Sequence, residues 1–212
     1  MTKKNIYDEG PNAQMKLSDP KQLNQLEKEF EQDVYKEFEF GFNSKDSIIY
    51  LHGDIQNGNL FDIVSKCRLI LNYRPEEDAE KPITVLLNSN GGDVYEALGI
   101  IDYFDSLSVP VNIIARGRAM SAAAMILCSA SGVRAASKNT TIMLHEASAE
   151  IYGKTADLKA NADHIDELED SFYKMLASKS NQTEEFWIKA CRKDFYMTAT
   201  KALEYGLIDQ IV

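Results

Sequence analysis

The stretch Gly117-Arg118-Ala119-Met120-Ser121-Ala122-Ala123-Ala124-Met125 decides the fold that we expect for this chain. An apolar run from Val109 to Ala115 precedes it and predicts a buried strand, which Gly117 should end. The alanines that follow favour a helix, so Ser121 is expected at the corner between a strand and a helix. The first N–H groups of a helix have no partner within it, and they would point at a group attacked by Ser121. Ser121 is therefore a candidate nucleophile, although a capping or buried serine has the same pattern.

A serine nucleophile needs a base, and the sequence has three histidines. His52 precedes the turn signal Gly53-Asp54, and His164 lies in a long polar helical segment, so both are expected at the surface. His145 follows the apolar run Thr141-Ile142-Met143-Leu144, which could bring it back beside Ser121. His145 is the candidate base, although a lone histidine at a strand end is often structural.

Apolar runs alternate with amphipathic segments from Ile48 onward, which predicts an α/β fold with a parallel sheet core and flanking helices. After Gly91-Gly92, Asp93 is expected to cap a helix, with Glu96 in a capping-box relation. Thr155 is expected to cap a long helix that reaches Ser180, with an apolar stripe at Leu158, Ala162, Ile165, Leu168, Phe172 and Met175.

Composition limits the classes of function. The formal net charge of -10 argues against binding to nucleic acid or to an anionic membrane, because both need a basic surface. No apolar run is long enough to span a bilayer, and polar residues follow Met1-Thr2-Lys3-Lys4, so we expect a cytoplasmic protein. Three widely spaced cysteines suit reduced thiols better than disulfides or a metal site.

Residues 1–45 differ from the rest and are predicted to form an amino-terminal extension ahead of a domain over residues 46–212. Met1 to Pro20 is polar without a hydrophobic period and is expected to be flexible. From Lys21 to Glu39 an amphipathic helix is predicted, with apolar residues at Leu23, Leu26, Phe30, Val34 and Phe38.

Several blocks occur in a recognisable order: Asn88-Ser89-Asn90-Gly91-Gly92-Asp93-Val94, Gly117 with Ser121, Met143-Leu144-His145, Lys193-Asp194-Phe195-Tyr196-Met197-Thr198 and Ala202 to Asp209. Together they resemble the Clp protease proteolytic subunits, the ClpP-like serine peptidases, over residues 48–212. The resemblance implies a ClpP/crotonase-like fold and a serine endopeptidase that acts through an acyl-enzyme. It implies Ser121 as nucleophile, His145 as base and Asp194 as the residue that orients the histidine.

The same resemblance implies an oxyanion hole made by the N–H groups of Gly92 and Ala122. A glycine suits this role because no side chain blocks its amide, although paired glycines also mark ordinary tight turns. The absence of Gly-x-Gly-x-x-Gly and Gly-Lys-Ser/Thr patterns argues against phosphate binding. Substrate contacts are implied for Gly91, Asp93, Val94 and Ser148.

The resemblance also implies partners. The substrate would be a peptide or an unfolded protein, added as an extra strand along the groove that Glu146 to Gly153 line. The helix within Ile151 to Lys179 would be a projecting handle through which heptameric rings stack, and an AAA+ unfoldase could feed the chamber. The chemistry requires neither a metal nor an organic cofactor.

Some residues depart from the family pattern. Asn90 stands where a proline is usual, Arg118 and Met120 stand where residues are usually small or uncharged, and Glu146-Ala147 replaces Gln-Pro. These changes bear on substrate preference more than on the reaction. Alternative interpretations are a phage-type ClpP-like capsid maturation protease, a noncatalytic ring subunit, and a crotonase-type protein that binds acyl-CoA thioesters.

Overall fold

The computed structural model describes residues 28, 31–35, 37–148 and 153–212. The chain forms two compact units, Met1–Phe40 and Gly41–Val212. In the first unit, residues 28, 31–35 and 37–40 are helical, in agreement with the carboxyl-terminal half of the predicted amphipathic helix. The remainder of that helix and the polar stretch before it lie outside the described residues.

The second unit is built on a mixed, mostly parallel sheet of eight strands among the described residues. The strands are β1 (Phe42–Asn43), β2 (Ile48–His52), β3 (Ile83–Ser89), β4 (Val111–Met120), β5 (Arg134–Ala136), β6 (Thr141–Leu144), β7 (Phe195–Thr198) and β8 (Gln210–Ile211). Their order is β1-β2-β3-β4-β5-β8. Strand β6 pairs with β4 on one side and with β7 on the other. Only the β1–β2 and β6–β7 pairs are antiparallel. The predicted α/β class is confirmed.

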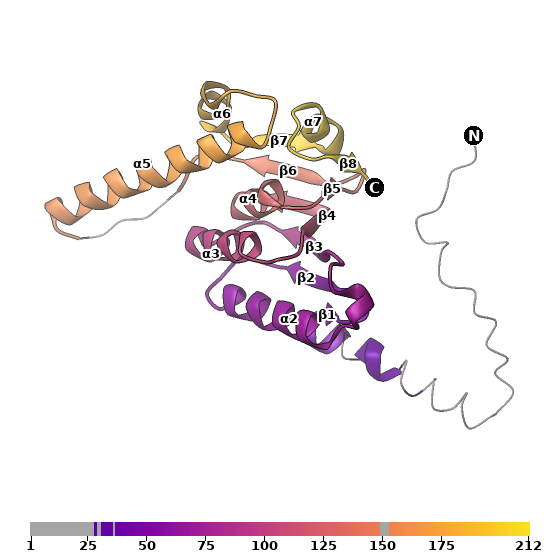
Figure 1. Ribbon diagram of the computed structural model, residues 1–212. Coiled ribbons are helices and arrows are strands. Elements are labelled where there is room, and N and C mark those ends of the chain that lie inside the picture. Colours follow the sequence, from indigo (N-terminus) through magenta and orange to yellow (C-terminus); the bar gives the residue numbers. More distant parts are fainter. Residues whose placement is uncertain (1–27, 29–30, 36, 149–152) are drawn as a thin grey trace, which may run out of the picture. The chain divides into compact units, whose positions relative to one another are not determined.

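Helices flank this sheet (Figure 1). They are α2 (Asn59–Tyr73), the 3-10 turn η1 (Glu76–Asp78), α3 (Val94–Asp105), α4 (Ala122–Ser129), α5 (Thr155–Ser178), α6 (Glu184–Cys191) and α7 (Ala199–Glu204). Three of them, α2, α3 and α4, lie on the same side of the sheet, and α5 projects from the body of the unit (Figure 1). Within the described residues, no helix is both long and apolar enough to cross a bilayer.

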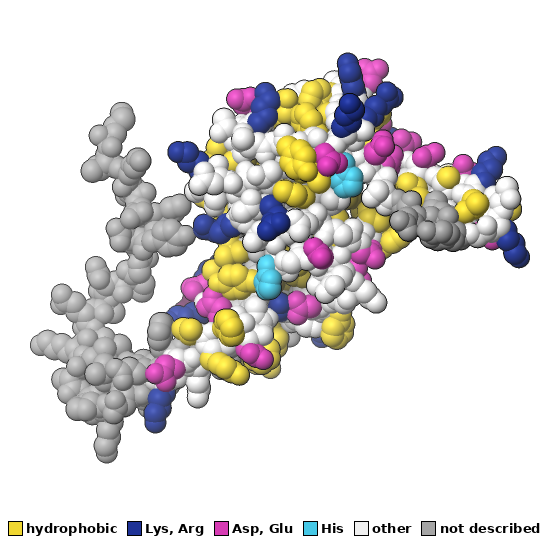
Figure 2. Space-filling model, turned by 180° about the vertical axis from the view of Figure 1, so that it is seen from behind, with side chains coloured by type: hydrophobic (Ala, Val, Ile, Leu, Met, Phe, Trp, Pro, Cys, Tyr) yellow, Lys and Arg dark blue, Asp and Glu magenta, His cyan; other side chains and the backbone are white. Residues whose placement is uncertain are grey.

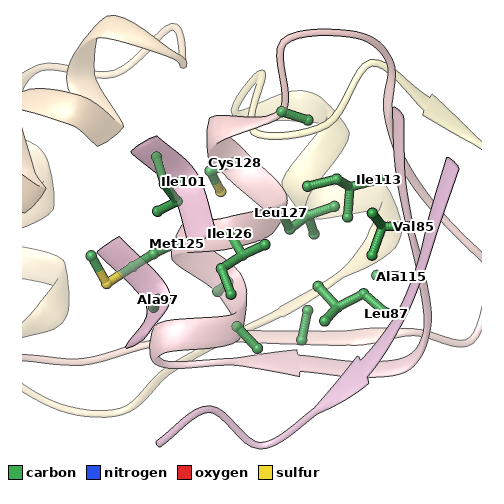
Figure 3. Close-up of a cluster of buried hydrophobic side chains, with 14 of the residues drawn as sticks. Val85, Leu87, Ala97, Ile101, Ile113, Ala115, Met125, Ile126, Leu127 and Cys128 are labelled. Atoms are coloured by element: carbon green, nitrogen blue, oxygen red, sulfur yellow. The ribbon is translucent and has the colours of Figure 1, made fainter. Parts of the chain in front are cut away.

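Helix α4 is the centre of the core. All eight of its residues are buried. Figure 3 shows Leu127 near Val85 and Ile113 of the sheet, and Met125 beside Ala97 of α3. Because α4 begins with three alanines, its first turn can pack closely without large side chains, and the corner that carries Ser121 is thereby seated in the core.

Strand β4 is longer than predicted. Gly117 does not end it: pairing with β3 resumes at Ala119, and the strand runs on to Met120. Leu87 pairs with Ala115 while Ser89 pairs with Ala119, so β4 has a bulge that contains Gly117 at a φ of +85°. Gly117 therefore bends the strand and does not stop it, because a glycine tolerates the positive φ of a bulge.

The structure confirms the predicted cap at Asp93 and corrects both its capping box and the cap predicted at Thr155. Asp93 caps α3 by accepting hydrogen bonds from the N–H groups of Tyr95 and Glu96. The Glu96 carboxylate does not close a capping box but accepts a bond of 2.8 Å from the N–H of Leu60, at the start of α2. Thr155 is the first residue of α5, and the preceding Lys154 makes no side-chain cap.

Candidate active site

Ser121 lies at the corner between β4, which ends at Met120, and α4, which begins at Ala122. Its backbone has a φ of 53° and a ψ of -126°, a conformation that costs energy for any residue with a side chain. The N–H of Ser121 donates a bond of 2.8 Å to the carbonyl of Met143 on the neighbouring strand. The core beneath α4 and this bond hold the strained corner in place.

The sheet brings His145 to this corner. Strands β4 and β6 are parallel and pair Met120 with Met143, so the residues that follow them emerge side by side. His145 comes directly after β6, and its Nε2 lies 2.8 Å from the Oγ of Ser121. This distance is short enough for direct proton transfer between the two groups.

A third strand, β7, brings Asp194 near His145. Strands β6 and β7 are antiparallel and pair Leu144 with Phe195, so Asp194 stands opposite His145 just beyond the last pair. The Asp194 side chain is exposed, and its Oδ2 accepts a hydrogen bond of 3.3 Å from the hydroxyl of Tyr196. Among the described residues, no hydrogen bond joins Asp194 to His145.

Gly92 and Ala122 line the same cavity as Ser121. Ala122 is the first residue of α4, so its N–H has no acceptor within the helix. Gly91 lies against this corner: a Cβ on it would come within 2.5 Å of the Met120 carbonyl oxygen and 2.9 Å of the Ala122 nitrogen. A Cβ on Gly92 would collide with the carbonyl of Ile55. The paired glycines therefore permit a close approach on both sides of the turn.

A cavity of about 440 Å³ opens beside Ser121 and His145. Its wall is mostly apolar and is built by α3, α4 and α5, with Val94, Leu98, Ile101, Met125, Ile165, Leu168, Phe172 and Met175. Of the four residues proposed for substrate contact, Asp93, Val94 and Ser148 line this cavity, whereas Gly91 does not line it and lies against the Ser121 corner. The apolar stripe of α5, which was interpreted as part of a handle, forms much of the wall.

Acidic groups also line this cavity. Glu146 and Glu169 line it, and Glu169 accepts a hydrogen bond from the N–H of Ala147. Glu169 sits on an acidic helix face, and nothing in the sequence distinguished it from its neighbours. Asp and Glu side chains also gather where α5 leaves the body (Figure 2).

The remaining histidines lie elsewhere. His52 is the exposed last residue of β2, as expected. His164 is exposed on α5, where its ring stacks on Tyr95 and its Nε2 lies 3.1 Å from the Tyr95 hydroxyl. Neither histidine contacts Ser121.

The cysteines are buried and free. Burial raises the pKa of Cys67, Cys128 and Cys191 to about 12, so these thiols stay protonated and do not compete with Ser121 as nucleophiles. The described part of the chain contains no group of three or more His, Cys, Asp or Glu side chains placed to hold a metal ion.

Comparison with known proteins gives a consistent match. The model of the family described as Clp protease matches residues 28–212. The chain is 31% identical over 169 residues to an ATP-dependent Clp protease proteolytic subunit of Deinococcus radiodurans, covering 79% of this chain and 81% of that protein. It is also 31% identical to subunit 2 of Synechococcus sp. strain CC9605 and 30% identical to subunit 1 of Prochlorococcus marinus strain NATL2A, covering 84% of each.

Proposed function

The chain belongs to the Clp protease family of serine-type peptidases, and from this premise we propose that it cleaves peptide bonds through an acyl-enzyme formed on Ser121. The observation that carries the proposal is the distance of 2.8 Å between the Oγ of Ser121 and the Nε2 of His145. A serine and a histidine in this contact form a nucleophile and its base. The contact supports an active enzyme over a noncatalytic ring subunit.

In the proposed cycle, His145 takes the proton of Ser121 as the Oγ attacks a peptide carbonyl. The N–H groups of Gly92 and Ala122 stabilise the oxyanion, and His145 then protonates the leaving amine. Water repeats these steps on the acyl-enzyme. Asp194 orients His145 in this scheme, which requires its carboxylate to leave Tyr196 and accept a bond from the other ring nitrogen.

The cavity supports a preference for substrates with an apolar side chain next to the cleaved bond. Its wall offers eight apolar side chains beside the nucleophile. A negatively charged side chain placed there would lose its hydration without gaining a cationic partner, because the described lining contains Glu146 and Glu169 but no Lys or Arg. Asp93, Val94 and Ser148 line the same cavity and are proposed to contact the peptide, while Gly91 is proposed to act by shaping the turn.

An assembly with an ATPase is also part of the proposal. The printed names of the relatives describe them as ATP-dependent proteolytic subunits. We propose that the present chain likewise forms stacked heptameric rings in the cytoplasm. An AAA+ unfoldase supplies these rings with unfolded protein. The first turns of α5, from Thr155 to His164, project with almost every residue exposed, which supports a contact between copies there.

A labelling experiment tests the chemistry. The purified chain should react with a fluorophosphonate, and mass spectrometry should place the adduct on Ser121. Ser121→Ala should remove the label, and His145→Ala should slow labelling strongly, while both variants keep the wild-type circular dichroism spectrum. Labelling of Ser121→Ala at the wild-type rate would overturn the assignment.

A second experiment tests the partner. Short fluorogenic peptides with an apolar residue before the cleaved bond should be hydrolysed by the chain alone. A stably folded protein should be degraded only when a Clp-type ATPase and ATP are added. Degradation of the folded protein without the ATPase would contradict this part of the proposal.

A further inference from the structure

A side-chain hydrogen bond joins the turn that carries Gly92 to the strand that carries Ser121. The guanidinium of Arg118 donates from Nη1 to the Oδ1 of Asn90 over 2.9 Å. Asn90 directly precedes Gly91-Gly92, and Arg118 precedes Ser121 by three residues on β4. The bond thus connects the two segments whose relative position sets the distance between a Gly92 amide and the nucleophile.

The bond starts from the bulge where backbone pairing is interrupted and ends on Asn90, just beyond the end of β3. Strands β3 and β4 pair through Leu87 with Ala115 and again through Ser89 with Ala119, and the bulge lies between. Residues 116–118 of β4 are exposed there. Arg118 therefore reaches past the Ser89–Ala119 pair and adds a side-chain contact between β4 and the turn that follows β3.

Backbone bonds also anchor the turn on its other side, and the N–H of Gly91 donates to the Oγ of Ser89 over 3.0 Å. The N–H of Ile55 donates to the Gly91 carbonyl and the N–H of Asp93 donates to the Ile55 carbonyl, each over 2.8 Å. These bonds tie the turn to the segment around Ile55, away from β4. Gly91 and Gly92, with φ values of +95° and +144°, have the least restricted backbone of any residue type. A contact from the β4 side would limit movement of these glycines relative to Ser121.

Neither Arg118 nor Asn90 lines the cavity beside Ser121. We infer that Arg118 is a positioning residue, which acts through Asn90 to hold the Gly92 amide at the place where the oxyanion forms. This inference rests on the proposed peptidase function. An amide in an oxyanion hole contributes most when it is held in position before the reaction, so a loosened turn lowers the rate of the chemical step.

The test is steady-state hydrolysis of a short apolar fluorogenic peptide by the full chain. Arg118→Ala and Asn90→Ala should each lower kcat about tenfold, the scale of one hydrogen bond to a charged donor, with KM changed less than about twofold. The double variant should be no slower than either single variant, because both remove the same contact. Asn90→Asp keeps the acceptor and should retain most of the wild-type kcat.

Arg116→Ala is the matched control, because Arg116 lies on the same bulge and donates to the Oγ of Ser137 at 3.4 Å instead of to the turn. Its kcat should equal that of the wild type. The inference fails if Arg118→Ala behaves like Arg116→Ala, or if the effects of Arg118→Ala and Asn90→Ala add. An inactive wild type without label on Ser121 would overturn the proposed function itself, together with this inference.

Discussion

The hydroxyl of Tyr196 donates a hydrogen bond of 3.3 Å to the carboxylate of Asp194, which stands opposite His145 across the β6–β7 pair. Asp194 is exposed, so its side chain can exchange this partner for another without unpacking the core. Under the proposed function, in which Asp194 orients His145, Tyr196 competes with His145 for one carboxylate.

Substitutions of Asp194 and Tyr196 should affect kcat differently. Asp194→Asn should lower kcat for peptide hydrolysis by about 10³- to 10⁴-fold, because the imidazole loses the charged group that orients it. Tyr196→Phe should leave kcat unchanged or raise it, since it removes only the competing donor. Steady-state assays check both. A loss in Tyr196→Phe as large as that in Asp194→Asn would show that Asp194 works through Tyr196.

Gly91 and Gly58 offer a matched pair of alanine substitutions. Both have a strongly positive φ, +95° and +100°, so alanine costs similar backbone strain at each. A Cβ at Gly58 meets nothing within 4 Å, whereas at Gly91 it comes within 2.5 Å of the Met120 carbonyl. Gly91→Ala should therefore abolish fluorophosphonate labelling of Ser121, while Gly58→Ala lowers stability and retains labelling. Equal labelling rates in the two variants would contradict the close approach.

Phe172 allows a test of the apolar cavity. Phe172→Ala removes a side chain from the wall and so enlarges the cavity. The ratio of kcat/KM for peptides with a bulkier aromatic residue before the cleaved bond to kcat/KM for peptides with leucine there should therefore rise by about tenfold or more. A panel of fluorogenic peptides measures the shift. Lys174→Ala, an exposed position on the same helix, is the control and should keep the wild-type order. An unchanged order in Phe172→Ala would place the substrate side chain elsewhere.

Asp209 links stability to pH. Burial by itself raises the pKa of this carboxyl, but the hydrogen bonds and charge of Arg134 outweigh it and hold the pKa below its ordinary 3.8. A lowered pKa in the folded state means that the stabilisation is fully present above about pH 4 and is lost as pH falls further.

Asp209→Asn should lower the free energy of unfolding by about 1 kcal/mol at pH 7, a modest value because solvent screens the partly exposed carboxylate. The difference from wild type should shrink near pH 3, as measured by denaturant titration at both pH values. Glu204→Gln removes the exposed partner of Lys201 and is the control. It should leave the midpoint of the denaturant titration unchanged. A difference that grows on acidification would have the wrong sign for this mechanism.

Much of the fold could be predicted because its signals are local. Helix α5 begins at Thr155, where the sequence predicts the start of a long helix, and ends at Ser178, two residues before the predicted Ser180, since an apolar period defines that segment. The end of β4 could not be predicted in this way. Gly117 is compatible with a strand end and with a bulge, and only the pairing of Ala119 with Ser89 decides between them.

In the candidate site, too, local motifs identify some residues, whereas only the fold shows which other residues surround them. Ser121 and His145 were recognised from short motifs, and the parallel pairing of β4 with β6 then places them in contact. The wall of the cavity was not recognised. The α5 stripe was visible as a helical period, but a period does not say whether a face meets the core, another copy of the chain or a cavity.

By itself, the sequence determined the alternation of strands and helices, the corner at Ser121 and the chemistry available there, because backbone propensity and side-chain type are properties of short segments. Only the tertiary structure decided which side chains meet. The contact of Arg118 with Asn90, the turn of Asp194 toward Tyr196 and the placing of α5 over the cavity each depend on strand register and helix packing. These arise from contacts between segments distant in the chain, which no local pattern records.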